Sequence, residues 1–146
     1  MMACGPVRPA PMAPAPVLQP KLQLAVIPAD SDAFPRAARA LSAALAHAQI
    51  AGVDSTAVSK VSLEVVQLSI ECVDPTDACY QAIGRSMAAN RLLFARIDGA
   101  HRKQLHVTVT LFDVDARTAR RTAEKLFATE DQAVDGAAAL VAEATR

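Results

Sequence analysis

The sequence predicts an α/β (α+β) domain in which a mixed sheet of four to five strands packs with three to four helices. Apolar strands alternate with amphipathic helices in the first two thirds of the chain, and a meander of alternating apolar and polar residues follows. A strand, helix, strand order needs a right-handed crossover between parallel strands, whereas strands joined by short turns pair antiparallel. We therefore expect a sheet that begins parallel and ends antiparallel.

Composition narrows the classes of function. Hydrophobic residues make up 52% of the 146, which excludes a disordered chain. Fifteen basic side chains balance fifteen acidic ones, so no net field attracts nucleic acid or an anionic lipid surface. The sequence contains no apolar run of the length that a transmembrane helix needs.

The composition changes abruptly near Lys21. Six of the nine prolines lie between Gly5 and Pro20, and each removes a backbone donor that a helix or an interior strand would use. In polyproline II form, at ~3.1 Å per residue, this stretch spans about 50 Å. Residues 1–20 are therefore predicted to be a truncated lipoprotein-signal remnant and a proline-rich tether, and residues 21–146 the folded domain.

Cys4 is the predicted lipidation site. The tetrad Met2-Ala3-Cys4-Gly5 resembles the end of a bacterial lipoprotein signal peptide, where a small residue precedes the cysteine that receives the lipid. The charged and apolar segments that come first in such signals are absent, so either the true start lies upstream or the match is chance. A lipid on Cys4 would anchor a periplasmic domain to the outer membrane; a plain disordered tail is the alternative.

The first strand and helix have clear local signals. Residues 22–27 form a run that is apolar except for Gln23 and that Pro28 ends, which is typical of a strand covered on both faces. Asp32 is the predicted N-cap of the following helix, Pro35 lies in its first turn, and Gly52 ends it.

The middle of the chain is less distinct. Residues 53–61 favour a short strand or an extended segment. Residues 62–70 favour a short helix capped by Ser62, with a strand as the alternative. Asp74 and Pro75 predict the start of another helix, which closes at Asn90 before an apolar strand over residues 92–97.

The last third predicts a hairpin, an edge strand and a helix. Asp98-Gly99 marks a turn, and residues 104–113 alternate so that Leu105 and Val107 face away from His106 and Thr108. Residues 119–127 are predicted to return as a charged edge strand, although a helix is possible there. Thr129 to Gln132 forms a capping box at the start of a terminal helix.

Two segments carry a family resemblance. Ala89-Asn90-Arg91-Leu92-Leu93 and Leu111-Phe112-Asp113 resemble motifs of the N-terminal α/β domain of TolB-like cell-envelope proteins, which is also found alone in short bacterial lipoproteins. The resemblance covers roughly residues 22–146. It implies an α/β fold and a place in the cell envelope of a Gram-negative bacterium.

Cys72 and Cys79 are the predicted disulfide. Cys72 lies two residues before Asp74 and Cys79 lies five after it, close to the pair of positions that touch in a hydrophobic staple. Free buried thiols and a metal site are the alternatives. A metal site needs further ligands, and His47, His101 and His106 show no ligand spacing.

No catalytic residue and no cofactor site is predicted. The sequence contains no glycine-rich phosphate-binding motif and no visible nucleophile–histidine–carboxylate set. We interpret His106 as a surface histidine. Asp113 and Asp115 are expected to accept local backbone donors rather than to act as a catalytic pair.

These observations favour a non-catalytic, periplasmic and lipid-anchored envelope protein that binds another envelope protein, without nucleic acid or metal. The docking surface is predicted on the sheet and its charged edge, and we expect proline at Ala123 to remove an edge donor there. A small cytoplasmic α/β enzyme or ligand-binding domain with an unrecognised pocket is the alternative. The predicted partner-binding edge consists of Arg120, Arg121, Glu124 and Lys125.

Overall fold

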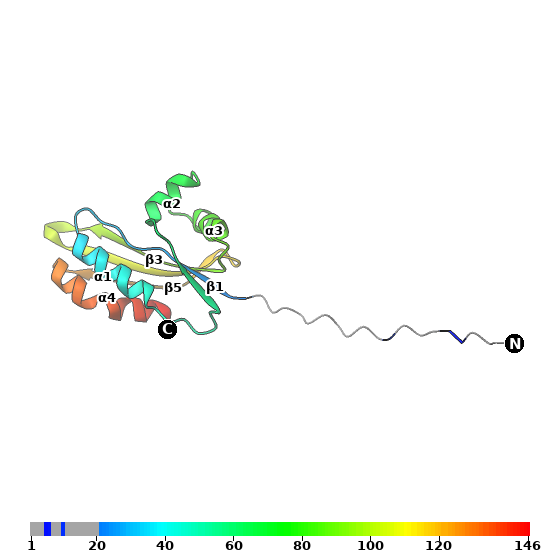
Figure 1. Ribbon diagram of the computed structural model, residues 1–146. Coiled ribbons are helices and arrows are strands. Elements are labelled where there is room, and N and C mark those ends of the chain that lie inside the picture. The colour runs from blue at the N-terminus through cyan, green and yellow to red at the C-terminus, as the bar shows by residue number, and fades with distance from the viewer. Residues whose placement is uncertain (1–4, 7–9, 11–20) are drawn as a thin grey trace.

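A five-stranded mixed sheet forms the centre of the domain (Figure 1). The computed structural model describes residues 5–6, 10 and 21–146. The central strand order is β2-β1-β3-β4-β5, with β1 parallel to both its neighbours and β3, β4 and β5 antiparallel. The strands are β1 (Gln23–Val26), β2 (Ser55–Val58), β3 (Arg91–Gly99), β4 (Leu105–Asp113) and β5 (Thr118–Phe127).

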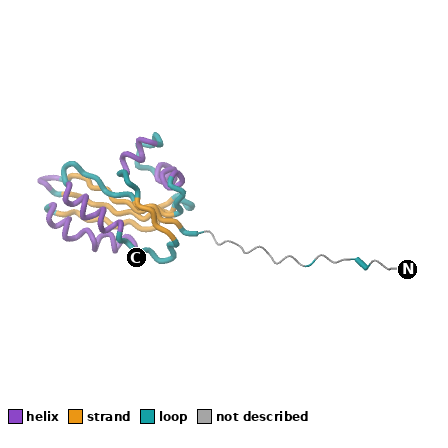
Figure 2. The backbone as a smooth tube through the Cα atoms, viewed as in Figure 1, coloured by secondary structure: helices purple, strands orange, loops and turns teal. Residues whose placement is uncertain are grey.

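Four α-helices cover the two faces of this sheet unequally. Helices α1 and α4 lie side by side along one face, whereas α2 and α3 stand together against one end of the other (Figures 1 and 2). The arrangement confirms the predicted α+β fold class. The helices are α1 (Pro35–Ala46), α2 (Leu63–Ser69), α3 (Asp77–Ser86) and α4 (Glu130–Thr145), with a short 3₁₀ turn η1 (His101–Lys103) between β3 and β4.

Each face of the sheet has its own apolar core. Odd-numbered residues of β3 and β4, such as Leu93 and Val107, pack beneath α1 and α4. Even-numbered residues, such as Phe94 and Phe112, pack with Tyr80 beneath α2 and α3. The predicted alternation along β4 is therefore correct. The face that carries His106 and Thr108 was predicted to be polar. In the structure it is polar only in the part that α2 and α3 leave uncovered.

Two helices begin later than predicted. Phe34, not Asp32, is the N-cap of α1, because the Ser31 hydroxyl closes the preceding turn by accepting the Phe34 N–H at 3.1 Å. Thr76, not Asp74, caps α3, and its hydroxyl accepts the Cys79 N–H at 3.2 Å. Both regions contain several residues that favour an N-cap, so the local signal does not choose between them.

Helix α1 is tied to the start of α4 by Arg36. Its guanidinium donates to Asp131 at 2.6 Å and pairs with Glu130 at 2.9 Å. The hydrogen bond from Arg36 to Asp131 is the main reason that the pKa of Arg36 lies above its ordinary value. The contact is solvent-exposed, so it orients the two helices more than it stabilises them.

Several element ends also differ from the prediction. Helix α1 ends at Ala46 rather than at Gly52, and α3 ends at Ser86 rather than at Asn90. Strand β3 continues through the predicted Asp98-Gly99 turn, because its ladder with β4 extends to the Ala100 N–H, which donates to Gln104 at 2.8 Å.

Other predicted elements are correct. Residues 55–58 form β2, Ser62 takes the N-cap position of α2 without a side-chain hydrogen bond, and the charged segment after residue 117 is a strand. Thr129 caps α4 by accepting the Gln132 N–H at 3.2 Å. The Gln132 side chain accepts the Ala128 N–H, one residue before the cap.

Candidate protein-interaction surface

Strand β5 forms one edge of the sheet, and the ladder shows which of its backbone groups have no partner strand among the described residues. The hydrogen bond from Ala100 to Gln104 continues the β3–β4 ladder. Because the direction of the backbone N–H and C=O groups alternates along a strand, those of even-numbered residues of β4 face β3 and those of odd-numbered residues face β5. Ala123 lies opposite Val109, so its backbone N–H faces β4. The expectation that Ala123 carries an edge donor is wrong. The outward N–H groups belong to Thr122, Glu124 and Leu126.

The four charged side chains predicted at this edge each contact another group of the domain. Except for the partly buried contact of Arg120 with Asp113, these contacts are exposed and contribute little to stability, but they hold the charged groups in defined positions. Arg120 lies 3.5 Å from the Asp113 carboxylate, Arg121 donates to the Glu143 carbonyl at 3.5 Å, Glu124 lies 3.3 Å from His106 Nε2, and Lys125 lies 5.4 Å from the centre of the Phe127 ring.

No described part of the chain covers the face of the sheet opposite α1 and α4 beyond α2 and α3. Cross-strand pairs place Arg96 beside Thr108 and Thr108 beside Glu124, and the next row runs from Asp98 through His106 to Leu126. Leu126 is 53% exposed although it is a large apolar residue within a strand. We name this surface the open face; it consists of Arg96, Asp98, His106, Thr108, Thr122, Glu124 and Leu126.

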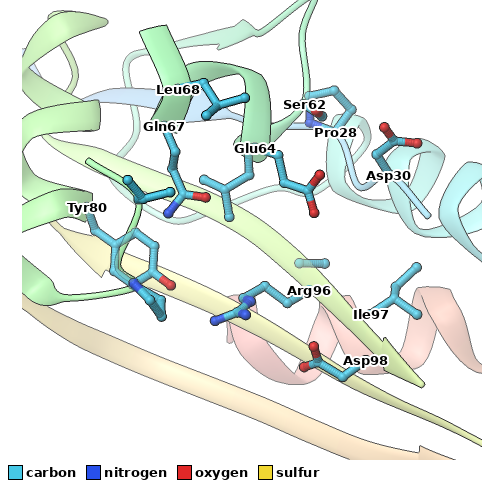
Figure 3. Close-up of a pocket in the computed structure, with 14 residues that line it drawn as sticks. Pro28, Asp30, Ser62, Glu64, Gln67, Leu68, Tyr80, Arg96, Ile97 and Asp98 are labelled. Atoms are coloured by element: carbon cyan, nitrogen blue, oxygen red, sulfur yellow. The ribbon is translucent and has the colours of Figure 1, made fainter. Parts of the chain in front are cut away.

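A groove of about 360 Å³ continues the open face beneath α2 (Figure 3). Glu64 on α2 lies across the groove from Arg96 and Asp98 on β3, as Figure 3 shows. Leu68 at its rim is 66% exposed, and Val73 is 71% exposed. The groove therefore combines charged groups on its floor with apolar side chains at its rim.

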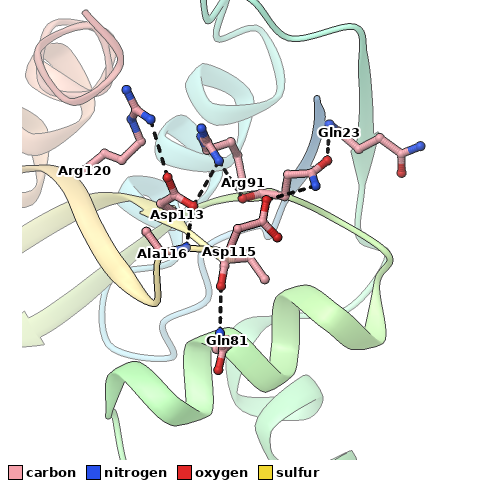
Figure 4. Close-up of polar contacts among 9 residues, drawn as sticks. Gln23, Gln81, Arg91, Asp113, Asp115, Ala116 and Arg120 are labelled. Atoms are coloured by element: carbon pink, nitrogen blue, oxygen red, sulfur yellow. Dashed lines mark hydrogen bonds and ion pairs between the residues drawn. The ribbon is translucent and has the colours of Figure 1, made fainter. Parts of the chain in front are cut away.

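A polar network fixes the end of β4 next to the turn into β5 (Figure 4). Asp113 pairs with Arg91 at 3.1 Å and accepts the Ala116 N–H at 3.0 Å, in addition to its contact with Arg120. Asp115 contacts the Asn90 side chain at 3.3 Å instead of a local backbone donor. Asp113 is almost fully buried and already paired, so its role here is to hold the turn.

The Asn90 side chain extends this network to the first strand. Its Oδ1 accepts the Gln23 N–H at 2.9 Å, while its backbone carbonyl accepts the Val114 N–H at the same distance. Gln81 on α3 donates to the Val114 carbonyl at 2.9 Å. Thus α3, β1 and the β4–β5 turn are joined at the end of the sheet where β3 begins.

Cys72 and Cys79 form a disulfide in the structure, with their Cα atoms 5.4 Å apart. Because Thr76 is the N-cap, Cys79 is the third residue of α3 and Cys72 lies four residues before the cap. The pair is therefore not at the positions of a hydrophobic staple. The bond instead closes the loop that carries Val73 and Pro75, both of which line the groove.

The remaining sequence-predicted residues are not brought into one site. His47 ends α1, His101 lies in η1 and His106 lies on β4. Within the described part of the chain, no group of three His, Cys, Asp or Glu side chains is placed to hold a metal ion. Cys4 lies outside the described residues.

The sequence pattern predicted a docking surface on the sheet and its charged edge and did not indicate the groove. The signal was present in the third strand, where Leu92 and Phe94 are followed on the same face by Arg96 and Asp98. A change from apolar to charged within one face marks the point where the cover of that face ends.

No known family model matches the chain, and no curated protein matches it. Among solved structures, it is similar to the C-terminal domain of LpoB from Salmonella enterica, with a TM-score of 0.47 and 16% identity over 77% of this chain and 87% of that one. It is also similar to a PelC dodecamer from Paraburkholderia phytofirmans, with a TM-score of 0.41 and 14% identity over 86% of this chain and 90% of that chain. The TolB-like resemblance stays a prediction.

Proposed function

We propose that this chain is a non-catalytic cell-envelope protein that binds another envelope protein through its open face, the adjoining groove and the β5 edge. The observation that carries the proposal is the unequal cover of the sheet. Helices α1 and α4 bury one face, while the other is left with exposed Leu126 and a groove rimmed by Leu68. Exposed apolar side chains set among charged ones are typical of protein-binding surfaces.

The β5 edge gives this surface a way to recognise a partner's backbone. The N–H groups of Thr122, Glu124 and Leu126 point away from β4, and a partner strand can add to such an edge. The charges of Arg120 and Glu124 oppose pairing with any strand that lacks complementary charges at the facing positions. This favours a specific partner over self-association.

We further propose that the domain works in the periplasm, anchored to the outer membrane through Cys4. The disulfide between Cys72 and Cys79 supports an oxidising compartment. The proline-rich stretch before Lys21 supports a spacer between an anchor and the domain. No helix among the described residues has the length and apolar character that crossing a membrane demands.

Site-specific photo-cross-linking in the native host tests the docking surface. A benzoylphenylalanine at Thr108 should yield one discrete adduct, whereas the same probe at Asp135, exposed on α4, should yield none. Adding Glu124→Lys should abolish the Thr108 adduct, while Asp135→Lys should leave it intact. Equal adducts from both probe positions would contradict the proposed surface.

A second pair of variants tests the backbone edge. Thr122→Pro removes an outward donor and should weaken the cross-link several-fold while circular dichroism stays unchanged. Ala123→Pro removes a ladder bond in the core, since Ala123 is 2% exposed, and should unfold the domain. Unchanged cross-linking in a folded Thr122→Pro variant would remove the β5 edge from the surface.

A ligand-binding or enzymatic role is the second candidate, favoured by the groove with Glu64, Arg96 and Asp98 around it. His106 lies outside this groove, and we assign it no chemistry. His106→Ala should therefore leave the stability of the domain nearly unchanged. Loss of an enzymatic activity in a folded His106→Ala protein would favour the enzyme.

A further inference from the structure

The second edge of the sheet, strand β2, has none of the protection found on β5. Its four residues, Ser55 to Val58, are all exposed, and none is charged or proline. Natural proteins protect such edges because unpaired backbone groups recruit another strand. Strand β2 is short, which itself limits recruitment, but its exposed and uncharged side chains leave the edge open to a matching strand.

The ladder shows which backbone groups of β2 have no partner within residues 21–146. Ser59 donates its N–H to Val26 at 2.8 Å, and Ser55 donates to Leu22 at 3.4 Å, so the odd-numbered residues face β1. Because the direction of the backbone groups alternates along a strand, those of Thr56 and Val58 point away from β1. Their N–H and C=O groups form the open edge.

The sequence around this edge is complementary to itself. When two copies of β2 run antiparallel about a two-fold axis at Ala57, Thr56 of each copy lies opposite Val58 of the other. The same register places Asp54 opposite Lys60, one residue beyond Ser59, so that opposite charges meet at both ends. Outward Thr56 and Val58 form hydrogen-bonded pairs, as an antiparallel ladder requires, and small Ala57 lies at the close, non-hydrogen-bonded pair on the axis.

We propose that two copies of this chain pair through β2 and form one continuous sheet across a two-fold axis. Charge complementarity favours a second copy as the occupant, because a copy in this register matches Asp54 with Lys60 at both ends. The proline-rich tether is a poor occupant, since its prolines have no N–H to donate to a ladder.

The proposed interface is small. A four-residue edge buries much less surface than a stable dimer, although Val58 at 50% exposure and Val61 at 43% add apolar area beside it. We therefore expect a reversible, concentration-dependent dimer. Strand β5 lies at the opposite edge of the sheet, so the inference is independent of the proposed partner surface.

A cross-link at the axis tests the register directly. In the full chain carrying Cys4→Ser, Ala57→Cys should form an intermolecular disulfide under mild oxidation, because the two Cβ atoms meet at the close pair. The matched control, Thr122→Cys on the β5 edge, should remain monomeric at the same concentration. Failure of Ala57→Cys to cross-link, or equal cross-linking by Thr122→Cys, would overturn the proposal.

Sedimentation equilibrium of the Cys4→Ser chain tests the charges and the outward donor. Lys60→Asp should weaken dimerisation about tenfold, and Asp54→Lys with Lys60→Asp should restore it. Recovery of the dimer in the double variant would show that Lys60→Asp acts through charge repulsion and not through misfolding. This control matters because Asp54 also accepts the Leu22 N–H at 2.7 Å. Thr56→Pro should abolish the dimer with the circular dichroism spectrum retained.

Two outcomes of this experiment would contradict the proposal. One is a monomer at every concentration, and the other is a dimer that Thr56→Pro leaves intact. If the chain alone is monomeric but Thr56→Pro removes an adduct with another envelope protein, the β2 edge belongs to a different partner and the second copy is rejected.

Discussion

Gly84 lies in the middle of α3, where the helix comes closest to the end of the antiparallel ladder. A Cβ atom placed on Gly84 would collide with the side chain of Val114, which follows β4. Glycine lowers helix propensity by about 1 kcal/mol relative to alanine, so its place inside a helix needs a packing reason. Close contact between α3 and Val114 supplies that reason.

Gly84→Ala should lower the stability of the domain despite the better helix former. Overpacking costs ~1–3 kcal/mol, which exceeds the propensity gain when the neighbouring group is a β-branched side chain with little freedom to move. Urea denaturation followed by circular dichroism measures the change. Arg85→Ala, exposed on the same helix, is the control and should have little effect.

Val114→Ala tests whether the expected loss of stability in Gly84→Ala arises from collision with the Val114 side chain. Alone it leaves a cavity and destabilises, but combined with Gly84→Ala it makes room for the added methyl group. The double variant should therefore be more stable than the sum of the two single effects predicts. Simple additivity of the two changes would mean that Gly84 and Val114 do not collide.

At the scale of elements, the loop before α3 depends on a covalent constraint. The segment between α2 and α3 has no regular structure, and few apolar side chains of this loop are buried. The bond between Cys72 and Cys79 joins it to the first turn of α3, while Thr76 caps that turn. The disulfide thus holds one wall of the groove in place.

Removing both cysteines should reduce the free energy of unfolding by about 2.5 kcal/mol, the chain-entropy value for closing a loop this short. The variant is Cys72→Ala with Cys79→Ala, compared with the parent by thermal unfolding. Dithiothreitol should lower the parent's Tm toward that of the variant and leave the variant unchanged. Mass analysis without reductant should find the oxidised parent two units lighter than its dithiol, and two alkylatable thiols in protein purified from the periplasm would refute the bond.

At the scale of the whole molecule, the sheet separates a structural side from a binding side. The core beneath α1 and α4, which includes Leu41 and Leu140, contains more buried residues than the core beneath α2 and α3. Helices α2 and α3 cover the other face only in part, and the two edges of the sheet differ in charge. The domain therefore offers one protected edge, one unprotected edge and one open face.

The proposed anchor belongs to this scale because it places the domain relative to a membrane. Protein made in the native host should incorporate a radioactive fatty acid and float with outer membranes, since the lipid on Cys4 would supply the membrane affinity. Cys4→Ser should abolish both behaviours. Fatty-acid label that persists in the Cys4→Ser protein would end the anchoring hypothesis.

Local patterns in the sequence determined the faces of the elements. The largely apolar run from Leu22 to Ile27, the alternation along residues 105–112 and the Thr129–Gln132 capping box each predicted an element that the structure contains. These signals are short-range, since hydrophobic periodicity and capping depend on residues within a few positions of one another. For the same reason they predicted the α+β class.

Only the tertiary structure determined the order of the strands, which backbone groups of each strand face which neighbour, and how much of each face the helices cover. Leu24 pairs with Arg91, far along the chain, and this pairing leaves β2 at an edge. The ladder turns Ala123 inward and Thr122 outward, which their side chains alone do not indicate. Which strands meet, and which backbone groups stay unpaired, depends on contacts between distant segments, so these properties arise from packing rather than from local pattern.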